Sequence, residues 1–524
     1  MKTRGLFLSA LLMGAVMAGC SNEEVMNEEF QKPDGNEYYM AVNFFTSETG
    51  SRAEGDFAAA SDAETDVNNA VFYFLDENGN SCADPYKHGE LTLAASTHHA
   101  GDDRQATPII VMKNPTTNPS SIVVLLNVAN DFAYENYKSL SQLQAIAGDY
   151  VDNANGFVMS NSVYANADDD VVIGAPVTAA NIYKTRKELE VGVTNNSAVA
   201  VPVHVERVLA KVQVTNKVGT NVTNNEITLT DKNGTETVAV NVTINGWWLD
   251  NTKDESLIIK DLDPSEFTAQ QTWWNDAANL RSYWAESYAN ADFLHNKWNS
   301  NDDDAIYCHE NTSKYPTQLV VAATLSVGND DATTLVRWRN TYYTEEGFKV
   351  AFLNNFLSAH KYYYETTAEG ATDKTYETIT VDMLDFAFNT NDNEDVTTYD
   401  YEAIVTLNEN APALYTVNGS TATAVEASEV SDKLEGFATV KLWKNGQAYY
   451  YLPIEHLDAS NANAIVRNHV YQMNLTSVAG LGTPVPNAEK VIIPTKVEND
   501  ELSYIAASVY VLKWKVVEND VELN

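Results

Sequence analysis

The sequence predicts an all-β fold of the β-sandwich type with only minor helices. Apolar and polar residues alternate with a period of two in many runs rich in Val, Ile, Tyr and Thr, which is the pattern of half-buried strands. Turns rich in Asn, Asp and Gly separate these runs, as at 76–79, 232–234 and 444–447. The expected strands include 71–75, 109–112, 121–126, 201–205, 238–244 and 319–327.

Helical periodicity is sparse. Residues 138–147 place Leu140, Leu143 and Ile146 on one helical face, and residues 345–360 form a second amphipathic stretch. We expect helices at these two places, as additions to the sheets.

The length of 524 residues favours two large β domains. A fresh strand begins after the turn region at 195–197, so we place a boundary near residue 205. The first domain then covers 53–204 and the second 205–480. Residues 481–524 are expected to hold a linker, which begins in the Gly- and Pro-rich stretch 480–486, and a final strand.

The charge balance and the absence of known motifs exclude several functions. The chain has 33 Lys and Arg against 73 Asp and Glu, a net charge of −40, and such a field repels nucleic acid. Nucleophile elbow, phosphate-loop, zinc-protease and dinucleotide motifs do not occur. We therefore expect no enzyme and no cofactor, although a carboxylate pair across a cleft stays open among so many acids.

No metal site is expected. The acidic runs at 168–170, 302–304 and 391–395 lack the Gly and the distal Glu of a calcium-binding loop, so they are interpreted as solvated loops. Cys82 and Cys308 lie too far apart in sequence for a disulfide framework. They either pair with each other or are buried singly.

Residues 1–20 have the features of a bacterial lipoprotein signal. A basic start precedes the apolar run 6–16, which is too short to span a bilayer, and small residues precede Cys20. Cys20 is the expected lipid acceptor; the alternative is an ordinary secretory peptide. The acidic stretch 21–24 resembles the surface-export tag of Bacteroidetes lipoproteins. We expect the protein outside the inner membrane, attached to the outer membrane by lipid alone.

A cluster of tryptophans suggests a rival function. Aromatic faces stack on sugars, so a surface glycan-binding lipoprotein is one interpretation, while packing in a core is the more common role of such residues. The cluster consists of Trp247, Trp248, Trp273, Trp274, Trp284 and Trp298.

A strand is expected immediately after the lipoprotein signal. Residues 37–46 place Met40, Val42 and Phe44 on one face, and a small, polar segment follows at 49–55. Arg52 in that segment is a favourable protease site. Cleavage between Arg52 and Ala53 would release the strand with the rest of 21–52, leaving an apolar groove and an unpaired edge if the strand belongs to a sheet.

The chain ends in another alternating strand, 505–517. Tyr510, Leu512, Trp514 and Val516 share one face, while lysines occupy the other. This strand either completes the sheet of its own domain or adds to the sheet of a neighbour.

Three segments closely resemble the Bacteroidales type V pilins (fimbrillins), in particular the Mfa-type major subunit of short fimbriae. They are Val-Glu-Arg-Val-Leu-Ala-Lys-Val at 205–212, Ala-Ile-Val-Arg-Asn-His-Val-Tyr at 464–471 and Val-Tyr-Val-Leu-Lys-Trp-Lys-Val at 509–516. The middle of the chain, about 215–460, matches loosely. A short stretch at 487–503 replaces the long Pro-rich insertion of some relatives.

The resemblance implies two transthyretin-like β-sandwich domains and a structural shaft subunit of a surface fimbria that supports adhesion and biofilm formation. It implies lipidation at Cys20, cleavage at Arg52-Ala53 by an Arg-specific protease, and a C-terminal donor strand. That strand fills the groove vacated in the next subunit of a homopolymer. Accessory anchor and tip subunits are the other implied partners, and a tip or anchor role is the alternative.

Overall fold

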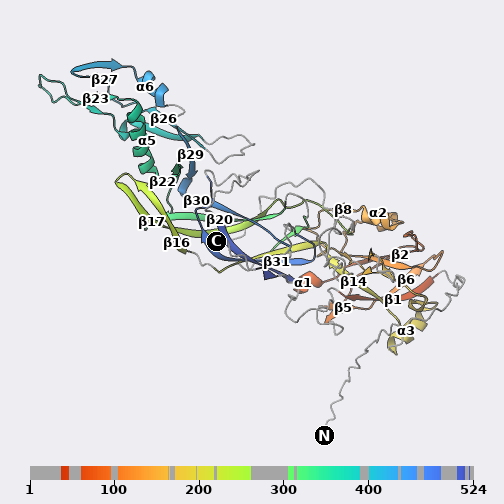
Figure 1. Cartoon of the computed structure of the whole chain (residues 1–524). Coiled ribbons are helices and arrows are strands. Elements are labelled where there is room, and N and C mark those ends of the chain that lie inside the picture. The colour runs from red at the N-terminus through yellow and green to blue at the C-terminus, as the bar shows by residue number, and fades with distance from the viewer. Residues whose placement is uncertain are drawn as a thin grey trace, which may run out of the picture.

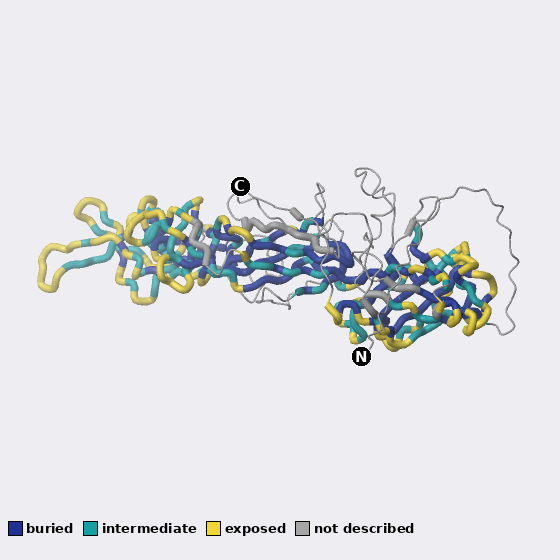
Figure 2. The backbone as a smooth tube through the Cα atoms, turned by 90° about the horizontal axis from the view of Figure 1, so that it is seen from below, coloured by how far each residue is buried: buried dark blue, intermediate teal, exposed yellow. Residues whose placement is uncertain are grey.

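The computed structural model shows a long molecule built almost entirely of strands (Figure 1). Buried positions are concentrated along its middle, and exposed positions gather at its two ends (Figure 2). The structure describes residues 37–45, 61–95, 104–162, 164–165, 171–195, 198–217, 221–260, 305–311, 316–389, 401–434, 438–456, 465–485, 504–513 and 518–519.

The N-terminal unit is a curved sheet with an apolar interior. Eleven strands of the described chain join in the order β3-β2-β7-β9-β14-β1-β5-β4, with β12 on β7 and with β6 and β13 on β1. Residues of β1, β2, β6, β7 and β14 share one core, to which Met40, Phe72 and Ile110 contribute fully buried side chains. The strands are β1 (Glu37–Phe45), β2 (Ala70–Leu75), β3 (Tyr86–His88), β4 (Ala94–Ala95), β5 (Arg104–Ala106), β6 (Ile109–Lys113), β7 (Ser121–Leu126), β9 (Met159–Asn161), β12 (Ala175–Pro176), β13 (Ile182–Tyr183) and β14 (Val201–Arg207).

Short elements surround this sheet. Ser139 caps α2 by accepting a hydrogen bond from the backbone N–H of Gln142. Leu143 of α2 then enters a second core on the outer face of β2 and β7. These elements are α1 (Asp62–Thr65), α2 (Leu140–Gln144), α3 (Arg186–Thr194), β8 (Ala147–Gly148), β10 (Tyr164–Ala165) and β11 (Val171–Val172).

The chain crosses from the N-terminal unit to a middle unit at Val208. β14 ends at Arg207 and β15 begins at Leu209. The middle unit is a sandwich, because side chains of a five-stranded and a ten-stranded sheet share one core, as Val212 and Val321 do. The five-stranded sheet of the described residues has the order β19-β15-β31-β33-β34, from β15 (Leu209–Asn216), β19 (Ala305–His309), β31 (His469–Ala479), β33 (Tyr504–Lys513) and β34 (Glu518–Asn519).

The ten-stranded sheet continues from the middle unit into a distal lobe, which lies at the opposite end of the molecule from the N-terminal unit (Figure 1). Its order within the described chain is β25-β26-β29-β21-β22-β16-β17-β20-β30-β32. The strands are β16 (Asn221–Asp231), β17 (Gly234–Asp250), β20 (Gln318–Val327), β21 (Leu335–Trp338), β22 (Thr341–Thr344), β25 (Leu384–Asn389), β26 (Tyr401–Leu407), β29 (Ala438–Trp443), β30 (Gln447–Pro453) and β32 (Thr483–Pro484).

The distal lobe has a core of its own around α5 (Glu345–Ala359). Phe348, Phe352 and Phe356 follow helical spacing and are fully buried. Gly347 lies so close to β16 that a Cβ atom would collide with the Thr230 carbonyl, so only glycine fits there. The lobe also holds α6 (Ala427–Leu434), β23 (Tyr363–Glu365), β24 (Tyr376–Thr378), β27 (Leu414–Asn418) and β28 (Thr421–Val425).

The predicted all-β class with minor helices is confirmed. Each of the six named strands and both helices form, with α2 and α5 at the expected places. Among the α-helices of the described residues, α1, α3 and α6 were not predicted. The region 205–480 also contains two separate cores rather than one, a division that the sequence did not indicate.

The stretch expected to begin a linker is packed. Leu481 and Val485 are buried, β32 pairs with β30, and the indole N–H of Trp443 donates to the Leu481 carbonyl at 3.0 Å. These apolar side chains hold the stretch against the ten-stranded sheet. Within the described residues, no helix is long and apolar enough to cross a membrane.

Candidate assembly site

β1 is an interior strand of the N-terminal unit, paired on both edges. Its first part pairs antiparallel with β6, from Glu37↔Lys113 to Ala41↔Ile109, and Met40 also pairs with Ile182 of β13. Its second part pairs in parallel with β14, from Val42↔Val201 to Phe45↔His204, and its end pairs with β5. Removing β1 would therefore leave two unsatisfied strand edges facing each other.

The side chains of β1 complete the core. Met40 and Val42 are fully buried and Tyr38 is 4% exposed, while burial raises the pKa of the Tyr38 hydroxyl. Burial of three such side chains contributes about 5–9 kcal/mol before entropy losses, at about 1.5–3 kcal/mol each. The side chain of Phe44 lies outside the described residues. The expected apolar face of this strand is thus buried at Met40 and Val42.

The predicted maturation residues cannot be located. Cys20, Arg52 and Ala53 all lie outside the described residues, which resume at Ser61 after Phe45. Their roles stay predictions.

The C-terminal strand pairs within its own chain. β33 runs antiparallel to β31 from Lys513↔His469 to Tyr504↔Ala479. In the described part of the chain, its other edge pairs with β34 at Val509 and Tyr510. Of the predicted donor residues, Tyr510 and Leu512 lie in β33, whereas Trp514 and Val516 lie outside the described residues. In the monomer, therefore, the strand completes its own domain's sheet, and donation to a neighbour would require its release.

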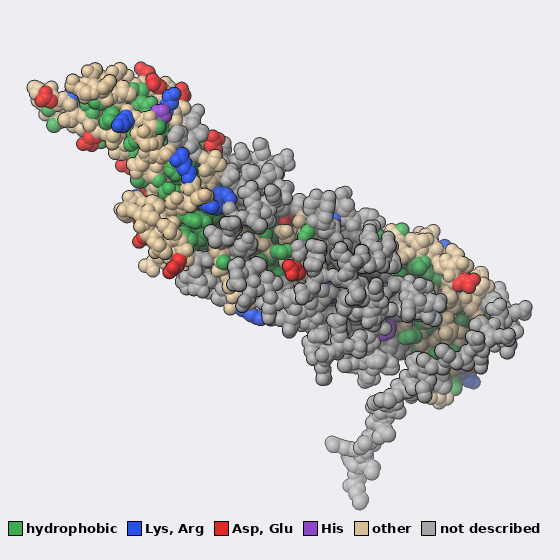
Figure 3. Space-filling model, in the orientation of Figure 1, with side chains coloured by type: hydrophobic (Ala, Val, Ile, Leu, Met, Phe, Trp, Pro, Cys, Tyr) green, Lys and Arg blue, Asp and Glu red, His purple; other side chains and the backbone are tan. Residues whose placement is uncertain are grey.

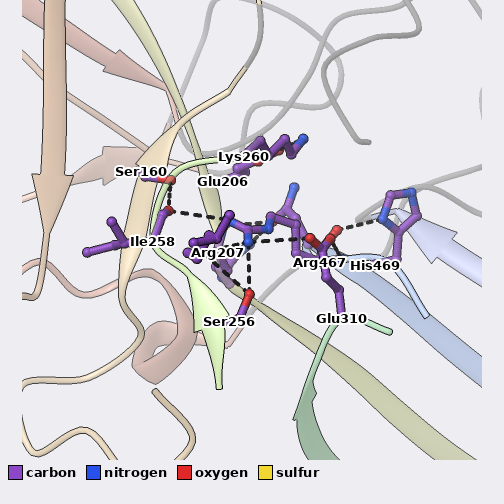
Figure 4. Close-up of polar contacts among 11 residues, drawn as sticks. Ser160, Glu206, Arg207, Ser256, Ile258, Lys260, Glu310, Arg467 and His469 are labelled. Carbon is purple, nitrogen blue, oxygen red and sulfur yellow. Dashed lines mark hydrogen bonds and ion pairs between the residues drawn. The ribbon is translucent and has the colours of Figure 1, made fainter. Parts of the chain in front are cut away.

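A buried charge cluster, defined as Glu206, Arg207, Lys260, Glu310 and Arg467, lies where the two units meet (Figure 4). Each of these side chains is at most 2% exposed. Lys260 Nζ lies 2.6 Å from Glu206 Oε2, and Arg467 Nη2 lies 3.4 Å from Glu310 Oε1. Buried charges are tolerated only when they are paired and hydrogen-bonded, so the cluster fixes how the units meet.

Arg467 is the centre of this cluster. Its guanidinium donates to Ser256 Oγ at 3.0 Å and to the carbonyls of Leu257 at 2.7 Å and Ile258 at 3.2 Å. The same Ile258 carbonyl accepts a hydrogen bond from Ser160 Oγ of the N-terminal unit at 2.7 Å. Strand β18 (Ser256–Leu257) also pairs with β8 of that unit. The segment 256–260 is thus held between the two units from both sides.

Glu64 of α1 ties the N-terminal unit to the middle unit at a second point. Its carboxylate accepts from Lys211 Nζ at 2.9 Å and from the Tyr307 hydroxyl at 2.8 Å. Burial raises the pKa of Glu64, but hydrogen bonds from Lys211, the Ser61 backbone and Tyr307 outweigh this effect and lower the pKa to about 2. The Glu64 carbonyl accepts from Arg207 Nε at 2.7 Å, which links this contact to the charge cluster.

Burial shifts the acid–base balance of the central pair. Desolvation raises the pKa of Glu206 to about 7 despite the nearby Lys260 and Arg467, and desolvation lowers the pKa of Lys260. Burial of the Lys260–Glu206 pair therefore costs free energy through desolvation. Removal of either partner would also cost free energy, because the other charge would stay buried without its partner. This cluster was not predicted, although the sequence carries an indication of it in charged residues that follow apolar ones within strands, as in Val-Glu-Arg at 205–207 and Val-Arg-Asn at 466–468.

The other candidate groups contribute little to a site. Cys82 and Cys308 are both buried, and they do not form a disulfide with each other. Trp247 and Trp248 are each 3% exposed and belong to cores, whereas the other four tryptophans of the cluster lie outside the described residues. In the described part of the chain, no group of three or more His, Cys, Asp or Glu could hold a metal ion; the acidic runs at 168–170, 302–304 and 391–395 lie outside it.

The C-terminal segment matches a known family. Residues 441–520 match the family model described as major fimbrial subunit protein type IV, Fimbrillin, C-terminal. Over these residues the chain is similar to the fimbrillins. This segment contains β30, β31, β33 and Arg467, and the predicted fimbrillin resemblance is confirmed. No curated protein matches the whole chain significantly.

Solved structures with a similar trace include fimbrial proteins. A Parabacteroides distasonis protein provisionally assigned to cell adhesion has 13% identity and a TM-score of 0.36, with coverage of 92% of this chain and 98% of that one. The tip fimbrial protein Mfa3 of Porphyromonas gingivalis has 11% identity, a TM-score of 0.28 and coverage of 90% and 99%. The fimbrial anchor protein Mfa2 of the same species has 10% identity and a TM-score of 0.19, with coverage of 65% of this chain and 95% of that one. These TM-scores are too low to support an argument about function.

Proposed function

We propose that this protein is a structural, non-enzymatic shaft subunit of a surface fimbria that polymerises by strand exchange. In this proposal the precursor is a lipoprotein attached to the outer membrane through Cys20. An Arg-specific protease cuts after Arg52, β1 leaves, and the C-terminal strand of another copy takes its place. The filament then supports adhesion and biofilm formation, with accessory anchor and tip subunits at its ends.

The position of β1 is the main support for the proposal. β1 precedes the predicted cleavage site, yet it lies inside the sheet with Met40 and Val42 fully buried. A strand that forms part of the core but belongs to a removable segment leaves a groove of defined shape when it goes. Because both flanking edges carry unpaired backbone groups, only another strand satisfies that groove.

The C-terminal strand has suitable chemistry for that role. Tyr510, Leu512, Trp514 and Val516 alternate with polar or smaller residues, so one face is apolar. In the described residues its second edge pairs with β34 at only two positions. A strand with one such sparsely paired edge could exchange by opening mainly its ladder with β31.

The surface charge favours separate filaments. Carboxylates are scattered over the face seen in Figure 3 rather than gathered in one patch, and the whole chain carries −40. Filaments of such subunits would repel one another sideways, with a strength that falls as salt is added.

Two alternatives remain. A tip or anchor subunit would share the β1 arrangement of a pilin but would not need to donate a strand, so the C-terminal strand favours the shaft. A glycan-binding lipoprotein was suggested by the tryptophans; burial of Trp247 and Trp248 removes these two from any sugar platform. Loss of glycan binding in Trp273→Ala or Trp274→Ala would favour that alternative.

The test is maturation of the precursor in vitro. Arg52→Ala should block cleavage by an Arg-specific protease and leave monomers in electron micrographs. Arg52→Lys is the matched control, because trypsin should still cut it and start polymerisation whereas the Arg-specific protease should not. Filaments formed by Arg52→Ala under either protease, or by a chain lacking its last twenty residues, would contradict the proposal.

A further inference from the structure

We infer that the contact between Arg207 and Asn468 couples the occupancy of the β1 position to the pairing of β33, so that the donor strand is held while β1 is present. This inference rests on the proposed function and concerns its regulation. It follows from the continuous path of strands and hydrogen bonds that joins the two ends of the chain.

The path begins at the strand that borders β1. β14 pairs in parallel with β1 over Val201–His204 and continues without interruption to Glu206 and Arg207. Val201, Val203 and Val205 of β14 pack in the same core as Met40 and Val42 of β1. Loss of β1 would therefore remove the hydrogen-bonding partner of Val201–His204 and part of the packing of β14, which would then keep, among the described strands, only its pairing with β9 at Val205–Arg207.

The second step links β14 to the turn before β31. The backbone N–H of Arg207 donates to Asn468 Oδ1 at 3.3 Å, and Arg207 Nη1 donates to the same oxygen at 3.2 Å. The backbone N–H of Asn468 donates to the Leu209 carbonyl at 2.8 Å. Asn468 is thus fixed from both sides of Val208, at the point where the chain passes between the units.

Asn468 is held in an unfavourable backbone conformation. Its φ is +58°, in the left-handed region that L-residues other than glycine adopt only at an energetic cost. Its neighbour Arg467 is fixed independently, since its backbone N–H donates to Glu310 Oε2 at 3.1 Å and its side chain is anchored in the buried charge cluster. A strained turn between two fixed groups is a place where a small shift of β14 can change the local conformation.

The last step leads from this turn to the donor residues. β31 begins at His469, directly after Asn468, and His469 pairs with Lys513. Leu512 and Tyr510 pair with Val470 and Gln472. The part of β33 that carries the predicted donor residues is therefore paired with the first residues after the turn, rather than with the far end of β31.

The coupling predicts an order of events. While β1 is in place, β14 holds Asn468, and β31 keeps the start of its ladder with β33. When β1 leaves, the hold on Asn468 weakens and the donor end of β33 is released more readily. Donor strands would then become available mainly on subunits whose own groove is open, which suppresses premature assembly of precursors.

The test is hydrogen exchange of the amides of 504–513 in the precursor and in the cleaved monomer, separated from its N-terminal peptide and kept dilute. In the wild type, cleavage should speed this exchange by roughly tenfold, equivalent to about 1.4 kcal/mol of opening free energy. Asn468→Gly keeps the positive φ but removes Oδ1, so exchange should already be fast in the precursor, and cleavage should add little.

Asn340→Gly is the matched control. Asn340 also has a positive φ, of 65°, and its Oδ1 also accepts from an arginine, Arg337 Nη2 at 3.2 Å, but it lies at the turn between β21 and β22 in the distal lobe. This variant should behave as the wild type. Exchange rates unchanged by cleavage, or equal in Asn468→Gly and Asn340→Gly, would overturn the coupling; filaments that still form would leave the proposed function intact. Cleaved wild type that forms no filaments would instead contradict the proposed function.

Discussion

β1 and β33 come from opposite ends of the chain and are held in different ways. β1 is paired along both edges and buries Met40 and Val42 in the N-terminal core. β33 is paired with β31 along one edge, and within the described residues its other edge meets two residues of β34. The leading strand is thus part of the core, so under the proposed function its removal would need proteolysis, whereas the trailing strand would exchange by opening one ladder.

The largest effect, on filament stability, is expected for Trp514 in the C-terminal strand. If Trp514 fills part of the groove in the next subunit, Trp514→Ala should weaken each junction by about 3–5 kcal/mol through lost burial. Filament resistance to heat in detergent measures this loss. The unfolding temperature of the precursor should change far less. A mutant filament as resistant as the wild type would show that this residue does not anchor the junction.

The next largest effect, on the stability of the precursor, is expected for Met40 of β1. Met40→Ala should destabilise the precursor by about 2–5 kcal/mol, because it leaves a cavity in a fully buried position. Thermal unfolding of the uncleaved protein measures it. After cleavage and removal of β1 the same mutation should have no effect, since the residue is gone. A mutant that remained less stable after cleavage would show that β1 stays bound.

A smaller effect is expected for Glu64, a residue that would remain in the protein after β1 is removed. Glu64 follows the proposed cleavage site in the sequence, and its folded-state pKa of about 2 lies below the ordinary 4.5. Its stabilising contribution is therefore present above about pH 4.5 and is lost as the pH falls toward 2, at most about 3 kcal/mol. Glu64→Gln should remove this part of the acid sensitivity. The substitution should reduce the acid sensitivity of the precursor and of the cleaved protein by the same amount. Unfolding free energies of both forms, measured at several pH values, test this.

The smallest effect is expected for Thr344 in the distal lobe, which serves as a negative control because it lies in neither β1 nor β33. Thr344 caps α5 by accepting a hydrogen bond from the Gly347 backbone N–H at 3.0 Å. Thr344→Ala should cost about 1 kcal/mol of stability in the distal lobe. Polymerisation and exchange of β33 should not change. An altered filament yield would mean that the lobe takes part in assembly.

The local structure was largely predictable from the sequence. Alternation located β2, β7 and β20 because each buries one face or both against a core. Helical spacing located α5 because Phe348, Phe352 and Phe356 face one side. The helix α6 was missed because it is short and buries only Val430 and Leu434, too few residues to establish a period.

The candidate site was only partly predictable. The alternation in residues 37–46 predicted a strand and its apolar face, but the partners of that strand, β6, β14, β5 and β13, are distant in sequence. The same holds for the charge cluster: Glu206 and Lys260 are 54 residues apart, and Arg467 and Glu310 are 157 apart. Local patterns carry no information about such pairings, which are selected by the packing of whole sheets.

The burial of the charge cluster has a consequence for how filaments of such subunits would respond to salt. Dissolved ions screen charges that face water but do not reach pairs such as Lys260–Glu206, whose side chains are at most 1% exposed. Rising ionic strength would thus relax the repulsion between neighbouring fibres and let them gather into bundles. The buried contact between the N-terminal and middle units of each subunit would keep its ion pairs at high salt as in dilute buffer.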